Sequence, residues 1–224
     1  MVNAHQIPLK LLHPVSYDLS DFIISTSNSN AFQFLNIFAE DKSHFGTVIG
    51  PVGSGKTHLL QGWGKATGAQ NIAPGDNVSE LQSDQVYFID DINQLNSDGE
   101  FSYPDAYLFH LYNWTKEINA KLVATADVAP VRWGRTLPDL VSRLGTVQVV
   151  PIEEPDDELL LVILIKLFSD RQLQVDINVL NYAINQMERS FSAAHRLVEL
   201  VDNTALAEKR KITKALVRSC LEAL

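Results

Sequence analysis

The sequence predicts an α/β domain with a parallel sheet, followed by a smaller all-helical domain, and three observations support this fold class. A phosphate-loop pattern at 50–57 stands between an apolar run and a helical pattern, which is the strand–loop–helix order that this motif needs. Short apolar runs at 86–89, 121–125 and 146–150 are typical of buried parallel strands. After Pro151, only helical patterns follow.

The first part of the chain supplies the predicted sheet and the helices that cover it. Residues 1–16 are rich in proline and isolated apolar residues, which predicts an extended arm. A helix over 28–39 follows a serine- and asparagine-rich stretch of the kind that caps helices, and Pro104 suits the first turn of another. In chain order, the other predicted elements are a strand ending at Ile49, a helix over 56–67, a short strand near 70–73, strands over 86–89, 121–125 and 146–150, and helices over 104–119 and 137–143.

The second part of the chain is predicted to be a helical domain. Its four helical patterns cover 159–168, 177–187, 193–206 and 213–224. The acidic residues 156–158 suit the start of the first of these helices, where they face the positive end of the helix dipole. We therefore divide the chain into an arm over 1–16, a nucleotide-binding core over 17–151 and a helical domain over 152–224.

Composition narrows the class of protein. With 224 residues, of which 46% are hydrophobic and 20% charged, the chain is an ordinary globular protein. A net charge of −9 argues against a broad DNA-coating surface, so we expect DNA contact to be indirect or weak. The single cysteine, Cys220, excludes an internal disulfide and suits the cytoplasm, and no signal peptide or membrane span is seen. The six histidines lack metal-ligand spacing, so we expect no zinc.

The run Gly50–Thr57 matches the phosphate-loop motif at every fixed position, which predicts that the protein binds ATP or ADP. Its glycines let backbone N–H groups turn toward phosphate oxygens. Lys56 would neutralise the β- and γ-phosphates, and Thr57 would ligate Mg²⁺ beside the helix N-terminus. The predicted nucleotide-binding residues of this region are Gly50, Pro51, Gly53, Ser54, Gly55, Lys56, Thr57 and His58.

Carboxylates follow two of the predicted strands. Asp90 and Asp91 end the apolar run 86–89, and in ATPases of this type such a carboxylate holds Mg²⁺. We assign that role to Asp90 and the orientation of the attacking water to Asp91; the alternative is a plain turn. Asp127 follows the strand 121–125, where it would sense the γ-phosphate or position water, although strands commonly end in Asp.

Arginines stand out in two places of this acidic chain. Residues 131–144 contain Arg132, Arg135 and Arg143, whose planar guanidinium groups suit phosphate, and the alternative is that they are solvated. Arg196 lies in the helix predicted over 193–206. It is either an exposed arginine that pairs weakly with its neighbours or a residue of the helical domain that contacts the nucleotide.

These motifs together resemble the DnaA-related AAA+ family, over about residues 17–224. The resemblance rests on 50–57, 89–92, 125–127, 140–144 and the Arg196 helix, which occur in the family's order and spacing. It implies a parallel five-stranded P-loop sheet sandwiched by helices and followed by a helical lid. It also implies that Phe22 borders the adenine, that Arg196 contacts the nucleotide, and that Arg143 is an arginine finger acting in trans.

The ends of the chain depart from DnaA and resemble a subgroup of this family, the Hda-type inactivators of DnaA. We find neither the helix-turn-helix DNA-binding domain nor the N-terminal interaction domain of DnaA. Instead, 6–11 resembles the motif that docks bacterial proteins on the DNA sliding clamp, with Gln6, Leu9 and Leu11 as anchors and Pro8 favouring an extended segment. The resemblance implies that the clamp and DnaA are partners of this chain and that it negatively regulates the initiation of replication. It also implies that intrinsic ATP hydrolysis is slow and that the ADP-bound form is the active one.

Two other function classes remain open on the sequence. A helicase-loader-type or remodelling ATPase would hydrolyse ATP itself and would bind a helicase instead of the clamp. A stand-alone P-loop kinase or hydrolase is disfavoured because we find no site for an acceptor substrate. A homodimer and a monomer are both compatible with the sequence.

Overall fold

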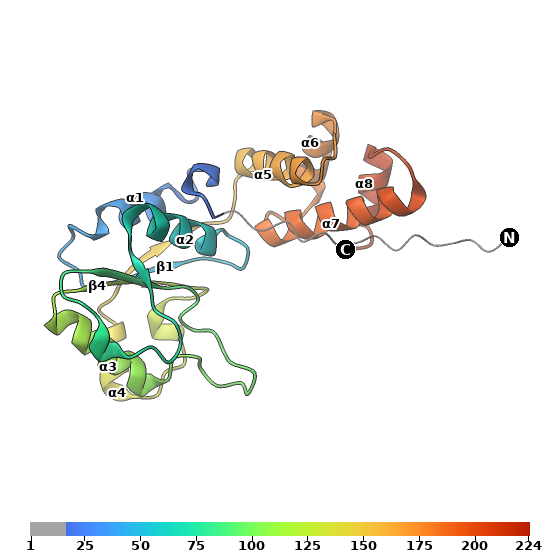
Figure 1. Ribbon diagram of the computed structural model, residues 1–224. Helices are drawn as coiled ribbons and strands as arrows, with labels where there is room; N and C mark the ends of the chain where they lie inside the picture. Colours follow the sequence, from blue (N-terminus) through green and yellow to red (C-terminus); the bar gives the residue numbers. More distant parts are fainter. Residues whose placement is uncertain (1–16) are drawn as a thin grey trace.

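The computed structural model describes residues 17–224 and has two parts, a sheet covered by helices on both faces and a group of four further helices (Figure 1). The predicted clamp-binding residues Gln6, Leu9 and Leu11 lie outside the described residues.

The sheet has five parallel strands in the order β2-β3-β4-β1-β5, which confirms the predicted sheet. The strands are β1 (Phe45–Ile49), β2 (Gln70–Asn71), β3 (Val86–Ile89), β4 (Lys121–Ala126) and β5 (Gln148–Pro151). Ile49 of β1 pairs with Ala126 of β4, and Ala124 pairs with Ile89 of β3. The carboxyl ends of these three strands therefore meet at one edge of the sheet.

Side chains alternate between the two faces of the sheet along each strand, and apolar residues on both faces explain why helices cover both. Val48, Phe88 and Val123 pack in one hydrophobic cluster with α1 (Ser29–Phe38) and α2 (Lys56–Thr67). Their neighbours Tyr87 and Leu122 point to the other face, into the cluster that includes α3 (Asp105–Glu117) and α4 (Pro138–Leu144). Figure 1 shows α1 and α2 on one side of the sheet and α3 and α4 on the other.

The helical lid has a hydrophobic cluster of its own, formed entirely by residues between Leu160 and Cys220. Its helices are α5 (Asp157–Asp170), α6 (Ile177–Gln186), α7 (Phe191–Glu208) and α8 (Lys214–Leu221), as predicted apart from their ends. α5 begins two residues earlier than predicted because the Asp156 side chain accepts a hydrogen bond from Leu159 N and caps the helix. Short 3-10 turns at η1 (Leu19–Asp21), η2 (Val78–Glu80) and η3 (Pro130–Arg132) complete the described chain.

Candidate functional site

The loop between β1 and α2 has a backbone that requires its glycines. Gly53 and Gly55 have φ values of 80° and 86°, in the left-handed region that other residues adopt at a cost. A β-carbon on Gly50 would lie 2.9 Å from Ser54 Oγ and 3.0 Å from the Ile152 carbonyl oxygen. Ser54 Oγ is itself buried and has no hydrogen-bond partner among the described residues. Such a loop at a helix N-terminus, with a buried hydroxyl to satisfy, fits the phosphate groups of a nucleotide.

Lys56 lies at the centre of this site and is only 9% exposed. Its Nζ donates to the carbonyl oxygens of Gly50 at 2.7 Å and Pro51 at 3.0 Å, and to Asp127 Oδ1 at 2.8 Å. Asp127 directly follows β4, so the sheet brings together two residues that lie 71 positions apart in the chain. A phosphate group would therefore compete with the Asp127 carboxylate for the Lys56 ammonium group.

Thr125, to which the sequence assigned no role of its own, is hydrogen-bonded to both residues at the end of β3. Thr125 Oγ1 donates to Asp90 Oδ1 at 2.6 Å and accepts from Asp91 N at 2.8 Å. The sequence signals for Thr125 are its place in the segment 125–127 of the family resemblance and its position two residues before Asp127. Within residues 17–224 no group of three His, Cys, Asp or Glu side chains is arranged to hold a metal. The assignment of Thr57 and Asp90 as Mg²⁺ ligands, together with phosphate oxygens, stays a prediction.

Negative charge from the Asp90 and Asp127 carboxylates surrounds Asp91 in this arrangement. Burial raises the pKa of the Asp91 carboxyl above its ordinary value, and the carboxylates of Asp127 and Asp90 raise it further, while Lys56 opposes the shift. Asp91 also has a φ of 51°, in the left-handed region. The charged form of Asp91 is therefore disfavoured in the folded protein relative to the unfolded chain.

Asp91→Asn is expected to stabilise the protein at neutral pH. A carboxyl whose pKa is raised on folding contributes stability below its unfolded pKa, and that contribution is lost as the pH rises through the folded pKa. Asparagine stays neutral and tolerates a positive φ, so we expect a higher melting temperature at pH 7. The gain should vanish below about pH 4. Thermal unfolding across this pH range measures it, with the exposed Asp98→Asn as the control. A melting temperature unchanged at pH 7 would contradict the assigned charge crowding.

Aromatic rings lie beside the phosphate loop. The Phe22 ring meets the His58 ring edge to face, with 5.6 Å between centroids, and stacks on Phe32 at 6.5 Å. A β-carbon on Gly55 would lie 3.4 Å from the Phe22 ring. His58 Nε2 is 2.9 Å from the Asp18 carbonyl oxygen, which ties α2 to the segment before Phe22. The structure thus brings Phe22 and His58 together beside the phosphate loop, and their contact with adenine stays a prediction.

The lid approaches the phosphate loop through the first residues of α7. The backbone nitrogen of Ser192 lies 3.2 Å from the position that a β-carbon on Gly53 would occupy. Arg196 lies one turn further along α7, where its side chain is 56% exposed and its Nη2 is 3.7 Å from Glu188 Oε2. Contact between Arg196 and a nucleotide stays a prediction. The α7 residue that lies against the phosphate loop is Ser192, which was not predicted from the sequence.

Arg143 lies away from this chain's own phosphate loop. It is in the last turn of α4, shortly before β5, whose first residue Gln148 pairs with Gly46 near the amino end of β1. The phosphate loop follows the carboxyl end of β1, so Arg143 lies toward the opposite edge of the sheet. Its guanidinium carbon is 5.1 Å and 5.4 Å from the ring centroids of Phe109 and Tyr112 on α3. The structure does not bring Arg143 into the nucleotide site of this chain.

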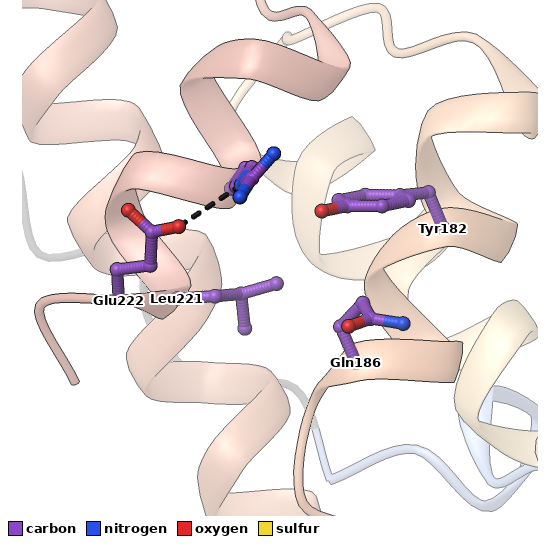
Figure 2. A pocket seen from close by; sticks show the side chains of 5 residues that line it. Tyr182, Gln186, Leu221 and Glu222 are labelled. Carbon is purple, nitrogen blue, oxygen red and sulfur yellow. Dashed lines mark hydrogen bonds and ion pairs between the residues drawn. The ribbon is translucent and has the colours of Figure 1, made fainter.

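A cavity of about 440 Å³ lies in the lid between α6 and α8 (Figure 2). Tyr182 and Gln186 line one side, and Leu221, Glu222 and Arg218 line the other, with Arg218 Nε donating to Glu222 Oε1 at 2.9 Å. None of the predicted site residues within 17–224 lines this cavity. Among the helices of residues 17–224, none is both long and apolar enough to cross a membrane.

Comparisons with known proteins agree with this architecture. Residues 157–221 match the family model described as the Hda lid domain. The chain is 25% identical to the chromosomal replication initiator protein DnaA of Clavibacter sepedonicus, over 93% of this chain and 48% of that protein, so it spans about half of that relative's length.

Solved structures show the same fold. Domain III of the Thermotoga maritima replication initiation protein DnaA matches with a TM-score of 0.71 and 19% identity, over 94% of this chain and 98% of that one. AMPPCP-bound DnaA from Aquifex aeolicus matches with a TM-score of 0.63 and 20% identity, over 87% and 68%. The sheet, its helices and the lid together form a DnaA domain III-like AAA+ fold.

Proposed function

We propose that this chain, which is similar to DnaA and whose residues 157–221 match the Hda lid model, is an adaptor that restrains the initiation of replication. The adaptor works in the cytoplasm, docks on the DNA sliding clamp and stimulates ATP hydrolysis by DnaA. The observation that carries this proposal is the place of Arg143. An arginine suited to phosphate, lying away from this chain's own phosphate loop, is available to the nucleotide of a neighbouring subunit.

The adaptor binds ADP or ATP with Mg²⁺ through the residues described above. Lys56 and the loop's backbone N–H groups hold the phosphates, Thr57 and Asp90 hold the metal ion, and Phe22 with His58 borders the adenine. The AMPPCP bound to a DnaA of the same fold supports nucleotide binding by this chain. In this account Asp91 and Asp127 orient water for a slow hydrolysis, and Arg196 adds a contact from the lid. The bound nucleotide chiefly sets the shape of the adaptor, which acts as a monomer or homodimer.

In the partner, Arg143 supplies positive charge at the moment of hydrolysis. As the phosphoryl group of ATP on DnaA is transferred to water, negative charge builds on its oxygens. A guanidinium group that reaches these oxygens from the neighbouring subunit offsets that charge in the transition state. The Phe109 and Tyr112 rings beneath the Arg143 guanidinium restrict where it lies, which reduces the cost of fixing it.

The adaptor proposal is tested most simply through the predicted arm. Replacing Gln6, Leu9 and Leu11 together by alanine removes the anchors, and we expect binding to the clamp to be lost in gel filtration of the mixture. Nucleotide affinity and thermal stability should not change, because the arm over 1–16 is predicted to be extended and separate from the nucleotide-binding core. Lys10→Ala, within the same segment, is the matched control and should still bind. Co-elution of the triple variant with the clamp would contradict the assignment of the arm.

A remodelling ATPase of the helicase-loader type is the second candidate. The observation in its favour is that Lys56, Asp90, Asp91 and Asp127 gather at one edge of the sheet, which gives this chain the residues needed for its own hydrolysis. Binding of a replicative helicase, with no binding to the clamp, would decide for this candidate.

A further inference from the structure

Arg135 is a buried cation that neither the phosphate loop nor the predicted finger explains. Its side chain is only 1% exposed, and its guanidinium carbon lies 3.8 Å from the Phe101 ring centroid and 6.0 Å from that of Trp133. Burying a charged group is costly unless that group is paired and hydrogen-bonded. The partners of Arg135 therefore show what this charge organises.

The first set of partners holds the turn that carries the site carboxylates. Arg135 Nη2 donates to the Ile92 carbonyl oxygen and to Asn93 Oδ1, both at 3.2 Å. Ile92 directly follows Asp91, and Ile92 N donates to the Thr125 carbonyl oxygen at 3.0 Å. Arg135 is thus hydrogen-bonded to the residue next to the one predicted to orient water.

The second set of partners leads to the helix that carries Arg143. Arg135 Nη1 donates to the Tyr103 carbonyl oxygen at 2.7 Å and lies 3.4 Å from Asp105 Oδ1. The other oxygen of Asp105 accepts hydrogen bonds from Thr136 N at 2.8 Å and Leu137 N at 3.0 Å, immediately before α4 begins.

The far end of α4 is attached to α3 as well. Asp105 is the first residue of α3, and Arg143, in the last turn of α4, lies over the Phe109 and Tyr112 rings of the same helix. α4 is therefore fixed to α3 at both of its ends, and the Arg135–Asp105 pair connects this unit to the turn at Asp91.

We propose that Arg135 is a positioning residue that couples the nucleotide site of this chain to α4, and through α4 to Arg143. Its planar fork donates from Nη2 toward the Asp91 turn and from Nη1 toward Tyr103 and Asp105, which the compact ammonium group of lysine does not reproduce. A nucleotide that orders the Asp90–Asp91 turn also orders α4 through these contacts. The role of Arg143 rests on the proposed function, but the coupling is a property of this chain alone.

Hydrogen–deuterium exchange on the full-length protein, with and without Mg·ADP, tests the coupling. In the parent protein, Mg·ADP should slow amide exchange both in 50–60 and in 136–144. In Arg135→Lys, the slowing in 50–60 should persist while the slowing in 136–144 disappears. Arg132→Lys changes an exposed arginine of the same segment and should behave as the parent does. Equal slowing of 136–144 in Arg135→Lys and the parent, or no slowing of 136–144 in the parent, would overturn the proposal.

A second variant covers the case in which Arg135→Lys does not fold. Asp105→Asn weakens the same pair from the other side and should lose the slowing in 136–144 as well. A folded Asp105→Asn protein in which Mg·ADP slows exchange in 136–144 normally would overturn the coupling. If neither variant shows a cooperative unfolding transition, the proposal is overturned as well, because the Arg135–Asp105 pair would then serve stability alone. DnaA takes no part in this experiment. Normal coupling in a chain that fails to stimulate DnaA would therefore refute the proposed function and leave this inference standing.

Discussion

Replacing Arg143 by alanine is expected to abolish the stimulation of ATP hydrolysis by DnaA, with a loss on the order of 10³-fold or more in the stimulated rate constant. Arginine fingers that act in trans are worth about 10³–10⁵ in rate in GTPase systems, because they offset charge that develops on the transferred phosphoryl group. Arg143 lies toward the sheet edge opposite the phosphate loop, so the affinity of this chain for ADP should be nearly unchanged. Hydrolysis by ATP-bound DnaA on clamp-loaded DNA measures the first effect, and calorimetry with ADP the second.

The Arg143 experiment has a matched control and two informative outcomes. Arg132→Ala removes an exposed arginine eleven positions earlier and should stimulate as the parent does. Normal stimulation by Arg143→Ala would mean that this arginine has no catalytic task. Lost stimulation together with lost ADP binding would place Arg143 in the nucleotide site of its own chain, against the geometry of α4.

Replacing Lys56 by alanine should weaken ADP binding by at least about tenfold, the second largest effect that we expect. A charge-assisted hydrogen bond contributes about 1.5–3 kcal/mol, and about 1.4 kcal/mol corresponds to tenfold in affinity. Asp127→Asn should act in the opposite direction and strengthen ADP binding, because the Asp127 carboxylate pairs with Lys56 at 2.8 Å and competes with phosphate. Calorimetry on both variants measures these shifts. Equal ADP affinity in Lys56→Ala and the parent would contradict the phosphate-loop assignment.

The parts of the fold that depend on local pattern could be predicted from the sequence. The apolar runs that form β3 and β4, and the loop between β1 and α2, are local features, and their order predicts a parallel sheet. In such a sheet the carboxyl ends of neighbouring strands lie together, so the approach of Asp91 to Asp127 follows from topology. The start of β5 was predicted less accurately: the strand was expected from Thr146 and begins at Gln148. Thr146 N still donates to the Arg143 carbonyl oxygen at the end of α4, which delays the strand.

Contacts between segments that are distant in the chain could not be predicted from the sequence. Arg132, Arg135 and Arg143 are similar in composition and context, yet one is exposed, one is buried against Phe101 and one lies on the rings of α3. Only the packing of the loop before α3 against the segment before α4 separates them. Likewise, helical periodicity does not tell which turn of α7 meets the phosphate loop, and the turn that does so carries Ser192.

The central claim is that this chain makes DnaA hydrolyse its ATP, and one measurement tests it most directly. DnaA loaded with radiolabelled ATP is mixed with clamp-loaded DNA, with and without the parent protein in its ADP-bound form, and the ratio of ADP to ATP on DnaA is followed in time. We predict that conversion to ADP is accelerated only when both the clamp and this protein are present. An unchanged rate of conversion, with the protein folded, ADP-bound and held on the clamp, would contradict the account.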